Sequence, residues 1–273
     1  MPEAPDLEVI KEYLTERMVG RPVLRAKVLR PTVLRSLAGD FATEIAGLTL
    51  ESMERRGKYL LLWFSEGRCL AVNPMLTGAF QYCDETSRVL KRSCIVLGLE
   101  NGKELRYLDD RQMGRVYFVA EEQLGEVPRL LDQGPDVLSD ISFEEFAARL
   151  KGFRGEIKGV LARGSWISGI GNAYSDEILF AAGISPFRKA GSLSREDIRS
   201  LHGQSKKVVR DAIDELRGRV GDNIHVKIRD FLKVHNKGGE ACPNCGGNIS
   251  QLTANQQITS YCRRCQPGML ISN

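Results

Sequence analysis

The chain begins Met1-Pro2-Glu3-Ala4-Pro5-Asp6-Leu7-Glu8, a stretch that joins the start of a helix to a reactive chain end. Apolar residues recur at three- and four-residue intervals from Leu7 to Met18, and Pro5 suits a first helical turn, so a helix is expected over 5–18. Removal of Met1, which normally occurs before a small residue, leaves a free secondary amine on Pro2. A candidate reactive group therefore stands beside a helix N-terminus.

The chemistry of this terminus suits covalent catalysis. An α-amino group has a reference pKa of about 8, against about 10.4 for lysine, so about a tenth of it is unprotonated at pH 7. Such an amine can attack a sugar aldehyde carbon or an equivalent electrophile and form an iminium. Glu3 stands next to it and can give or take the protons that this reaction moves. Alternatively, Met-Pro-Glu is simply one common way for a cytosolic chain to begin.

Composition restricts the class of protein. The 273 residues suggest two domains with an appendage, and the apolar runs are far shorter than a membrane span needs. No signal peptide opens the chain, so we expect a soluble cytoplasmic protein that does not contact membranes. The net charge is only +4, with basic residues gathered at Lys227 to Lys237 and at Arg263-Arg264. An anionic partner fits this pattern, although most proteins with such a balance bind no nucleic acid.

The first half of the chain has the pattern of an antiparallel β-structure. From Val23 to about Val119, short β-rich runs occupy residues 58–64, 69–72, 93–99 and 104–108. Asn101-Gly102 between the last two runs is a strong hairpin signal. This spacing predicts a two-layer β-sandwich rather than alternating β/α units.

After Pro128 the pattern becomes helical. Ser142 with Glu145 three residues later forms a capping-box pattern for a helix that ends near Leu150, and further helices are expected over 156–162, 172–182 and 194–216. The turn Ser168-Gly169-Ile170-Gly171-Asn172 leads directly into one of them, and such a turn presents backbone N–H groups to an anion. A tight helix-turn-helix corner that needs glycine only for steric reasons is the open alternative.

Four of the seven cysteines form a metal-binding pattern. Cys242 and Cys245 are separated by two residues, as are Cys262 and Cys265, with sixteen residues between the pairs. This spacing predicts a four-thiolate Zn²⁺ site, structural because no coordination position stays open for water. The residues between the pairs, 246–261, are expected to form a β-hairpin. Cys69, Cys83 and Cys94 lie in strand-like sequence and are interpreted as buried or inert thiols.

Taken together, these features resemble the formamidopyrimidine-DNA glycosylase and endonuclease VIII family over nearly the whole chain. The most specific matching stretches are Pro2 to Glu8, Gly57-Lys58-Tyr59-Leu60-Leu61, Ile170-Gly171-Asn172-Ala173-Tyr174-Ser175-Asp176-Glu177 and Tyr261-Cys262-Arg263-Arg264-Cys265. The resemblance implies an α+β fold: a β-sandwich catalytic domain with an N-terminal helix (1–125), a helix-two-turn-helix DNA-binding domain (126–232) and a zinc finger (233–273). It also implies a monomer that binds double-stranded damaged DNA in a bacterial-type cytoplasm, associated with the nucleoid.

The implied activity is base-excision repair, in which the enzyme flips a damaged nucleotide out of the duplex. By this resemblance, Pro2 attacks the sugar C1′, displaces the base and leaves an iminium that eliminates the 3′ phosphate. Glu3 serves as the general acid for ring opening. Lys58 holds a phosphate and assists elimination, although a solvated lysine at a strand end is the alternative. The protein is then a DNA N-glycosylase, a hydrolase, that also has abasic-site lyase activity.

The resemblance also assigns DNA contacts. Asn172 binds backbone phosphate; the alternative, which is compatible with phosphate binding, is that its side chain caps the helix. Arg111 fills or probes the gap left by the flipped base, and Met113 stands where phenylalanine is frequent. Arg92 contacts the DNA backbone or belongs to a solvated basic face. Leu76 occupies the position of an inserted methionine and can still enter a base stack.

Three departures bear on the substrate. Gln257 lies in the hairpin position where many members have a phosphate-binding arginine, and a neutral amide cannot supply that charge. Asp6 replaces a glutamate, one methylene shorter. The segment 221–234 is short compared with members that cap 8-oxoguanine with a long loop. Ring-opened purines, oxidised pyrimidines and abasic sites remain open as targets, with the opposite base and single-strand, bubble or cross-link substrates undecided.

Two alternatives to the enzyme are kept. The first is a damage-binding or abasic-site-binding protein of the same architecture that has lost base excision, suggested by the altered loops and Gln257. The second is a zinc-ribbon nucleic-acid adaptor without preference for damage.

Overall fold

The computed structural model describes residues 1–254 and 257–268. The chain forms two compact units. One, called the sandwich unit, contains residues 1–132 and 213–228; the other, called the helical unit, contains residues 133–212 and those from 229 onward. One boundary between the units falls inside the long helix α6 (Arg195–Arg219), so they group the chain differently from the three expected segments, which stay a prediction.

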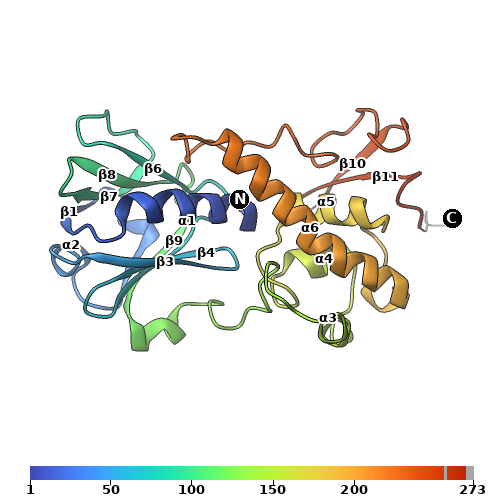
Figure 1. The fold of residues 1–273 in the computed structure, drawn as a ribbon, viewed down its shortest axis with the longest axis horizontal. Helices are drawn as coiled ribbons and strands as arrows, with labels where there is room; N and C mark the ends of the chain where they lie inside the picture. The colour runs from blue at the N-terminus through green and yellow to red at the C-terminus, as the bar shows by residue number, and fades with distance from the viewer. Residues whose placement is uncertain (255–256, 269–273) are drawn as a thin grey trace. The chain divides into compact units, whose positions relative to one another are not determined.

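The sandwich unit has two antiparallel-rich sheets, as the sequence predicts (Figure 1). The four-stranded sheet has the order β1-β7-β8-β6, with β1 (Val23–Val28), β7 (Ser93–Leu99), β8 (Lys103–Leu108) and β6 (Ala79–Asp84). The five-stranded sheet has the order β2-β9-β5-β4-β3, with β2 (Leu34–Ser36), β9 (Arg115–Ala120), β5 (Arg68–Asn73), β4 (Tyr59–Phe64) and β3 (Leu50–Arg56). A short helix, α2 (Phe41–Glu44), lies between β2 and β3 in the chain.

Helix α1 (Ala4–Met18) contributes one apolar face to the sandwich core. Its residues Leu7, Ile10, Leu14 and Met18 pack in one buried cluster with side chains from both sheets. Strand β4 is buried on both faces, because Leu60 and Leu62 join this cluster while Tyr59 and Leu61 join a second one with Val127 and Leu130. Successive strand residues point to opposite faces. This two-sided burial accounts for the uninterrupted apolar sequence of β4.

The helical unit contains α3 (Phe143–Leu150), α4 (Ile157–Ala162), α5 (Asn172–Ala182) and the part of α6 up to Ala212. Ser142 caps α3 by accepting a hydrogen bond from the Glu145 N–H at 3.1 Å, as the capping-box pattern predicts. Gly183 ends α5 in the left-handed conformation, with φ of 71°, which glycine adopts without steric cost. The helix expected over 194–216 continues to Arg219.

The C-terminal hairpin pairs β10 (Ile249–Ala254) with β11 (Gln257–Cys262), and its tip at 255–256 lies outside the described residues. Buried polar groups attach it to α4 and α5. The Lys158 ammonium donates to Asp176 Oδ1 and to the Ile258 carbonyl, each at 2.6 Å, while the Ser260 N–H donates to Asp176 Oδ2 at 3.1 Å. Glu177 accepts hydrogen bonds from three successive backbone N–H groups, residues 233–235. The family motif around Asp176-Glu177 therefore fixes the chain that leads into the hairpin.

Within the part of the chain that the structure describes, none of the helices has the length and apolar character required to span a bilayer.

Candidate active site

Pro2 is fixed in place by the cap of α1. Glu3 is the N-cap residue, in extended conformation, and its N–H donates to Asp6 Oδ2 at 2.8 Å. Both acidic side chains are buried, with exposed fractions of 2% for Glu3 and 9% for Asp6. Asp6, whose side chain is shorter than that of the family's glutamate, thus takes part in the helix cap by accepting this hydrogen bond. Pro2 itself is buried in the encoded chain, in which Met1 precedes it.

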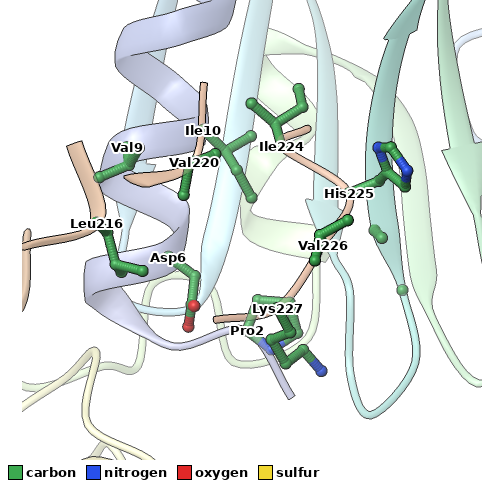
Figure 2. A pocket seen from close by; sticks show the side chains of 12 residues that line it. Pro2, Asp6, Val9, Ile10, Leu216, Val220, Ile224, His225, Val226 and Lys227 are labelled. Atoms are coloured by element: carbon green, nitrogen blue, oxygen red, sulfur yellow. The ribbon is translucent and has the colours of Figure 1, made fainter. Parts of the chain in front are cut away.

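A cavity of about 30 Å³ opens beside Pro2 within the sandwich unit (Figure 2). Its walls come from the start of α1, from the Gly78-Ala79 turn and from the segment at the end of α6. The lining residues are Pro2, Asp6, Val9, Ile10, Gly78, Ala79, Leu216, Val220, Ile224, His225, Val226 and Lys227. Figure 2 shows the Lys227 side chain next to Pro2, with the Asp6 carboxylate close by. The cavity thus combines apolar walls with a few charged groups near the chain end.

The electrostatics of this cavity favour a neutral chain-terminal amine. Burial, followed by the charge of Lys227, lowers the pKa of the Met1 α-amino group to about 5, while Glu3 and Asp6 act in the opposite direction. Desolvation disfavours the ammonium form, and a nearby cation disfavours it further. Burial and the Lys227 charge thus favour the neutral form of the Met1 α-amino group, and the neutral form of an amine is the nucleophilic one.

Lys58 lies in the turn Gly57-Lys58 that joins β3 to β4. Its side chain is half-buried. Burial lowers the pKa of Lys58, and the Glu3 carboxylate opposes this shift. The electrostatic interaction with Glu3 associates Lys58 with the α1 cap, so this part of the predicted catalytic set comes together in the sandwich unit.

The two predicted void-filling loops present their side chains to solvent. Leu76 is 39% exposed and Met113 is 43% exposed, and Arg111 is also exposed. Each loop contains one non-glycine residue with positive φ: Met75 at 51° and Gln112 at 52°. Such conformations are uncommon outside glycine and need support from the surroundings.

A buried carboxylate joins these two loops. Asp109, 1% exposed, accepts hydrogen bonds from the Thr77 hydroxyl, from the Arg111 N–H at 3.2 Å and from the Gly114 N–H at 2.6 Å. The Tyr107 ring fills the space beside it. A Cβ at Gly114 would lie 1.7 Å from the Tyr107 hydroxyl oxygen, and one at Gly78 would lie 2.3 Å from it. Both loops therefore depend on glycine where they meet Tyr107.

Arg92 pairs with the Asp110 carboxylate at 3.5 Å and is partly exposed. Burial of His225 is the larger cause of its lowered pKa, and the positive charge of Arg92 is the second cause. The two interpretations of Arg92, as a DNA contact or a solvated basic residue, both stay open.

In the helical unit, Asn172 is the first helical residue of α5, and the N-cap position belongs to Gly171. The alternative in which the Asn172 side chain caps the helix is therefore wrong. Its Oδ1 atom is buried and has no hydrogen-bond partner among residues 1–254 and 257–268. A buried amide oxygen without a partner costs free energy, and a ligand or water that donates a hydrogen bond can remove this cost. Asn172 thus has free hydrogen-bonding capacity at a helix N-terminus.

The four cysteines of the finger converge as predicted. The Sγ atoms of Cys242, Cys245, Cys262 and Cys265 all lie within 4.8 Å of one another. Four thiolates at this separation fit tetrahedral coordination of a metal ion. The other three cysteines lie elsewhere: burial raises the pKa of Cys69 to about 12 and that of Cys94 to about 11, and it also raises the pKa of half-buried Cys83. These three thiols are poor nucleophiles, as expected.

Comparison with known proteins gives this arrangement its context. The model of the formamidopyrimidine-DNA glycosylase N-terminal domain matches residues 1–116, and that of the formamidopyrimidine-DNA glycosylase H2TH domain matches residues 133–222. The chain belongs to the formamidopyrimidine-DNA glycosylase family. The formamidopyrimidine-DNA glycosylase of Symbiobacterium thermophilum is 34% identical, covering 98% of this chain and 90% of its own. That of Moorella thermoacetica is 35% identical, covering 92% of this chain and 94% of its own.

Solved structures of the Lactococcus lactis formamidopyrimidine-DNA glycosylase share the fold. Its complex with abasic-site DNA has a TM-score of 0.87, and its complex with DNA containing Fapy-dG has a TM-score of 0.89. In each case the identity is 24%, and the match covers 97% of this chain and 100% of the other. The predicted family and fold class are confirmed.

Three residues of this candidate site are not predicted from the sequence. Lys227 belongs to the basic stretch at Lys227 to Lys237, and no sequence motif marks His225 or Asp109. No short-range spacing marks them, because each becomes part of the site through contacts with residues far away in the chain.

Proposed function

We propose that this member of the formamidopyrimidine-DNA glycosylase family is a bifunctional base-excision repair enzyme in which Pro2 is the nucleophile. Family membership supports DNA N-glycosylase activity with abasic-site lyase activity. The observation that carries the assignment of Pro2 is its position in a small cavity that Lys227 also lines, where burial and the Lys227 charge lower the pKa of the preceding Met1 α-amino group. A neutral secondary amine is the species that attacks a sugar carbon.

The proposed reaction begins once Met1 has been removed. The Pro2 nitrogen forms a bond to C1′ of the everted nucleotide, and the bond from C1′ to the base breaks, so that the base leaves with the electron pair of that bond and takes up the proton that the Pro2 nitrogen releases. Glu3, buried next to Pro2, gives a proton to the ring oxygen as the sugar opens to the iminium. Loss of a C2′ proton from the iminium then expels the 3′ phosphate by β-elimination. Water finally hydrolyses the iminium and releases Pro2.

We assign Lys58 to a phosphate next to the flipped nucleotide, where it also assists elimination. Its partial burial next to Glu3 supports this role, because charged hydrogen bonds strengthen when water is excluded. Leu76, Arg111 and Met113 are assigned to the gap left by the flipped base. The exposure of all three side chains supports this assignment.

We assign the remaining contacts to the DNA backbone. Asn172 is assigned to a phosphate at the N-terminus of α5, to which its side-chain N–H₂ group would donate a hydrogen bond. Arg92 is assigned to phosphate as well. Gln257 is the first residue of β11 and is exposed. Its side chain supplies hydrogen bonds but no charge, so we expect a product mixture shifted towards the first elimination. The substrate is damaged double-stranded DNA, with abasic sites, ring-opened purines or oxidised pyrimidines as targets.

We further propose that the four-cysteine cluster holds one Zn²⁺ ion with a structural role. Thiolate ligands at this spacing favour zinc over harder metals, and four of them leave no position for catalytic water. Because the enzyme acts on genomic DNA, we expect a monomer that works in the bacterial cytoplasm at the nucleoid.

Borohydride trapping on duplex DNA with an abasic site tests the proposed nucleophile. The native protein should form a covalent adduct, and the Pro2→Gly variant should form at most a small fraction of it. Pro22→Gly, in the same unit but outside the cavity, is the matched control and should behave like the native protein. Equal adduct formation by the native protein and Pro2→Gly would contradict the requirement for the Pro2 secondary amine.

A damage-binding protein without base excision is the second candidate. The exposed Gln257 in place of a charged residue favours it, since weaker phosphate neutralisation lowers catalysis more readily than shape recognition. This candidate predicts tight binding to abasic-site DNA with no cleavage across a panel of oxidised bases. Excision of any one base in the panel excludes it.

A further inference from the structure

Lys227 lies at the meeting point of two parts of the candidate site. It lines the cavity together with Pro2, and Figure 2 shows the two side chains next to each other. Its ammonium group also donates a hydrogen bond to the carbonyl oxygen of Leu76 at 3.3 Å. One side chain thus contacts the loop that carries the exposed Leu76 and faces the end of the chain that becomes the nucleophile.

The backbone around Lys227 is held in a defined position. Ile224, 4% exposed, belongs to the main core of the sandwich unit. The Asn223 N–H donates to the Val220 carbonyl at 3.1 Å, and the Val226 N–H donates to the Asn223 carbonyl at 2.8 Å. These two turns continue from the end of α6, which is itself tied to α1 by the Arg217–Glu12 ion pair at 2.6 Å. Lys227 therefore extends from an anchored segment.

Charged and titratable groups surround the chain end from several elements. Glu3 and Asp6 come from the α1 cap, Lys58 from the β3–β4 turn, and His225 and Lys227 from the segment after α6. The two carboxylates favour an ammonium. Burial, followed by the charge of Arg92, lowers the pKa of His225, so that its imidazole is neutral at pH 7. Among these groups Lys227 is the cation whose charge, after the larger effect of burial, lowers the pKa of the Met1 α-amino group, which precedes Pro2.

We propose that Lys227 is a further active-site residue, which faces the Pro2 amine and at the same time holds the Leu76 loop against the nucleophile's cavity. Its charge keeps the amine in its free-base form at neutral pH, against Glu3 and Asp6, and its hydrogen bond to the Leu76 backbone sets the position of the void-filling loop. This role rests on the proposed function of Pro2 as the nucleophile.

The pH dependence of single-turnover borohydride trapping tests this role in the full-length protein. The Lys227→Met substitution removes the charge and keeps most of the side-chain length. The low-pH limb of the plot of trapping rate against pH should therefore move to higher pH by on the order of 0.5–1 unit. Lys227→Arg should keep the native limb. Lys27→Met, at an exposed position of β1, is the matched control and should also keep the native low-pH limb.

A second variant separates the two contacts of Lys227. The hydrogen bond ends on the backbone of Leu76, so Leu76→Ala leaves it in place. This variant should lower the trapping rate on duplex DNA by several-fold without moving the acidic limb. If the low-pH limb moved as far in Leu76→Ala as in Lys227→Met, the assignment would be overturned. The position of the loop, rather than the charge of Lys227, would then determine the pKa of the amine.

The outcomes distinguish this proposal from the function on which it rests. A Pro2-dependent adduct whose pH profile is the same in native protein and Lys227→Met contradicts the role of Lys227 alone. An adduct that survives Pro2→Gly, or the absence of any adduct in the native protein, overturns the proposed nucleophile and the role of Lys227 with it.

Discussion

The carboxylate of Asp109 accepts a hydrogen bond from the Gly114 N–H at 2.6 Å, across the loop that carries Arg111 and Met113. The same carboxylate accepts a hydrogen bond from the hydroxyl of Thr77, which belongs to the loop of Leu76. One buried side chain thus connects the two loops that we assign to the gap in the DNA. Side chains that enter a base stack together must be held at fixed positions relative to each other, and a shared buried contact provides this.

Replacement in Asp109→Asn should disturb both loops. The asparagine amide has one oxygen acceptor and one N–H₂ donor, so its N–H₂ group would face one of the backbone N–H groups that now donate to the carboxylate. That buried N–H would lose its acceptor, at a cost of about 1–3 kcal/mol. We expect lower thermal stability and weaker binding to abasic-site DNA, measured by calorimetry and by titration. Asp110→Asn, at the neighbouring position that is 59% exposed, should change stability little. Equal effects of the two variants would contradict the connecting role of Asp109.

Replacement in Gly114→Ala should destabilise the protein through contact with Tyr107. The added Cβ would lie 1.7 Å from the Tyr107 hydroxyl oxygen, and overpacking of this kind costs about 1–3 kcal/mol. That hydroxyl has no hydrogen-bond partner in the described part of the chain, so Tyr107→Phe alone should be neutral or slightly stabilising. The double variant should recover part of the lost unfolding free energy in chemical denaturation. Additive effects of the two changes would disprove the steric cause.

Loss of a single thiolate should release the proposed zinc ion. Cys245→Ser removes one ligand of the four-cysteine cluster, and we expect its zinc content to fall well below one ion per chain by elemental mass spectrometry. Cys83→Ser, outside the cluster, should retain the native content. Chelation of the native protein should unfold the finger and abolish DNA binding, since structural zinc contributes directly to folding. Purified native protein without any bound metal would contradict the site.

Introduction of a charge at the hairpin should strengthen phosphate binding. Gln257→Arg adds one potential phosphate contact, so the plot of log affinity against log salt should steepen by roughly 0.9. The share of product from the second elimination should rise at the same time. Asn244→Arg adds the same charge at an exposed position between Cys242 and Cys245, and it should alter neither the product mixture nor the salt slope to this extent. Identical slopes for both variants would indicate a general effect of charge.

Most of the elements could be predicted from the sequence because their signals are local. The periodicity after Pro5, the capping pair Ser142 and Glu145, and the Asn101-Gly102 turn each determine a structure over a few residues. The four cysteines were equally clear, since their spacing alone brings the thiolates together.

The candidate site was less predictable where it depends on contacts between distant residues. Asp109 meets Thr77 thirty-two residues away in the chain, and Lys227 meets Leu76 at a separation of 151 residues. Neither contact leaves a pattern in sequence. Asn172 was correctly placed at the start of a helix, but the choice between Gly171 and Asn172 as the N-cap depends on backbone angles that a motif does not specify.

Peptide mapping by mass spectrometry of the borohydride-trapped complex is the most direct measurement of the central claim. We predict that Met1 is absent from the purified protein and that the reduced sugar adduct lies on the N-terminal peptide, on the Pro2 nitrogen. Retention of Met1 in active protein, or an adduct on the peptide that contains Lys58 or Lys227, would contradict the assignment of Pro2 as the nucleophile.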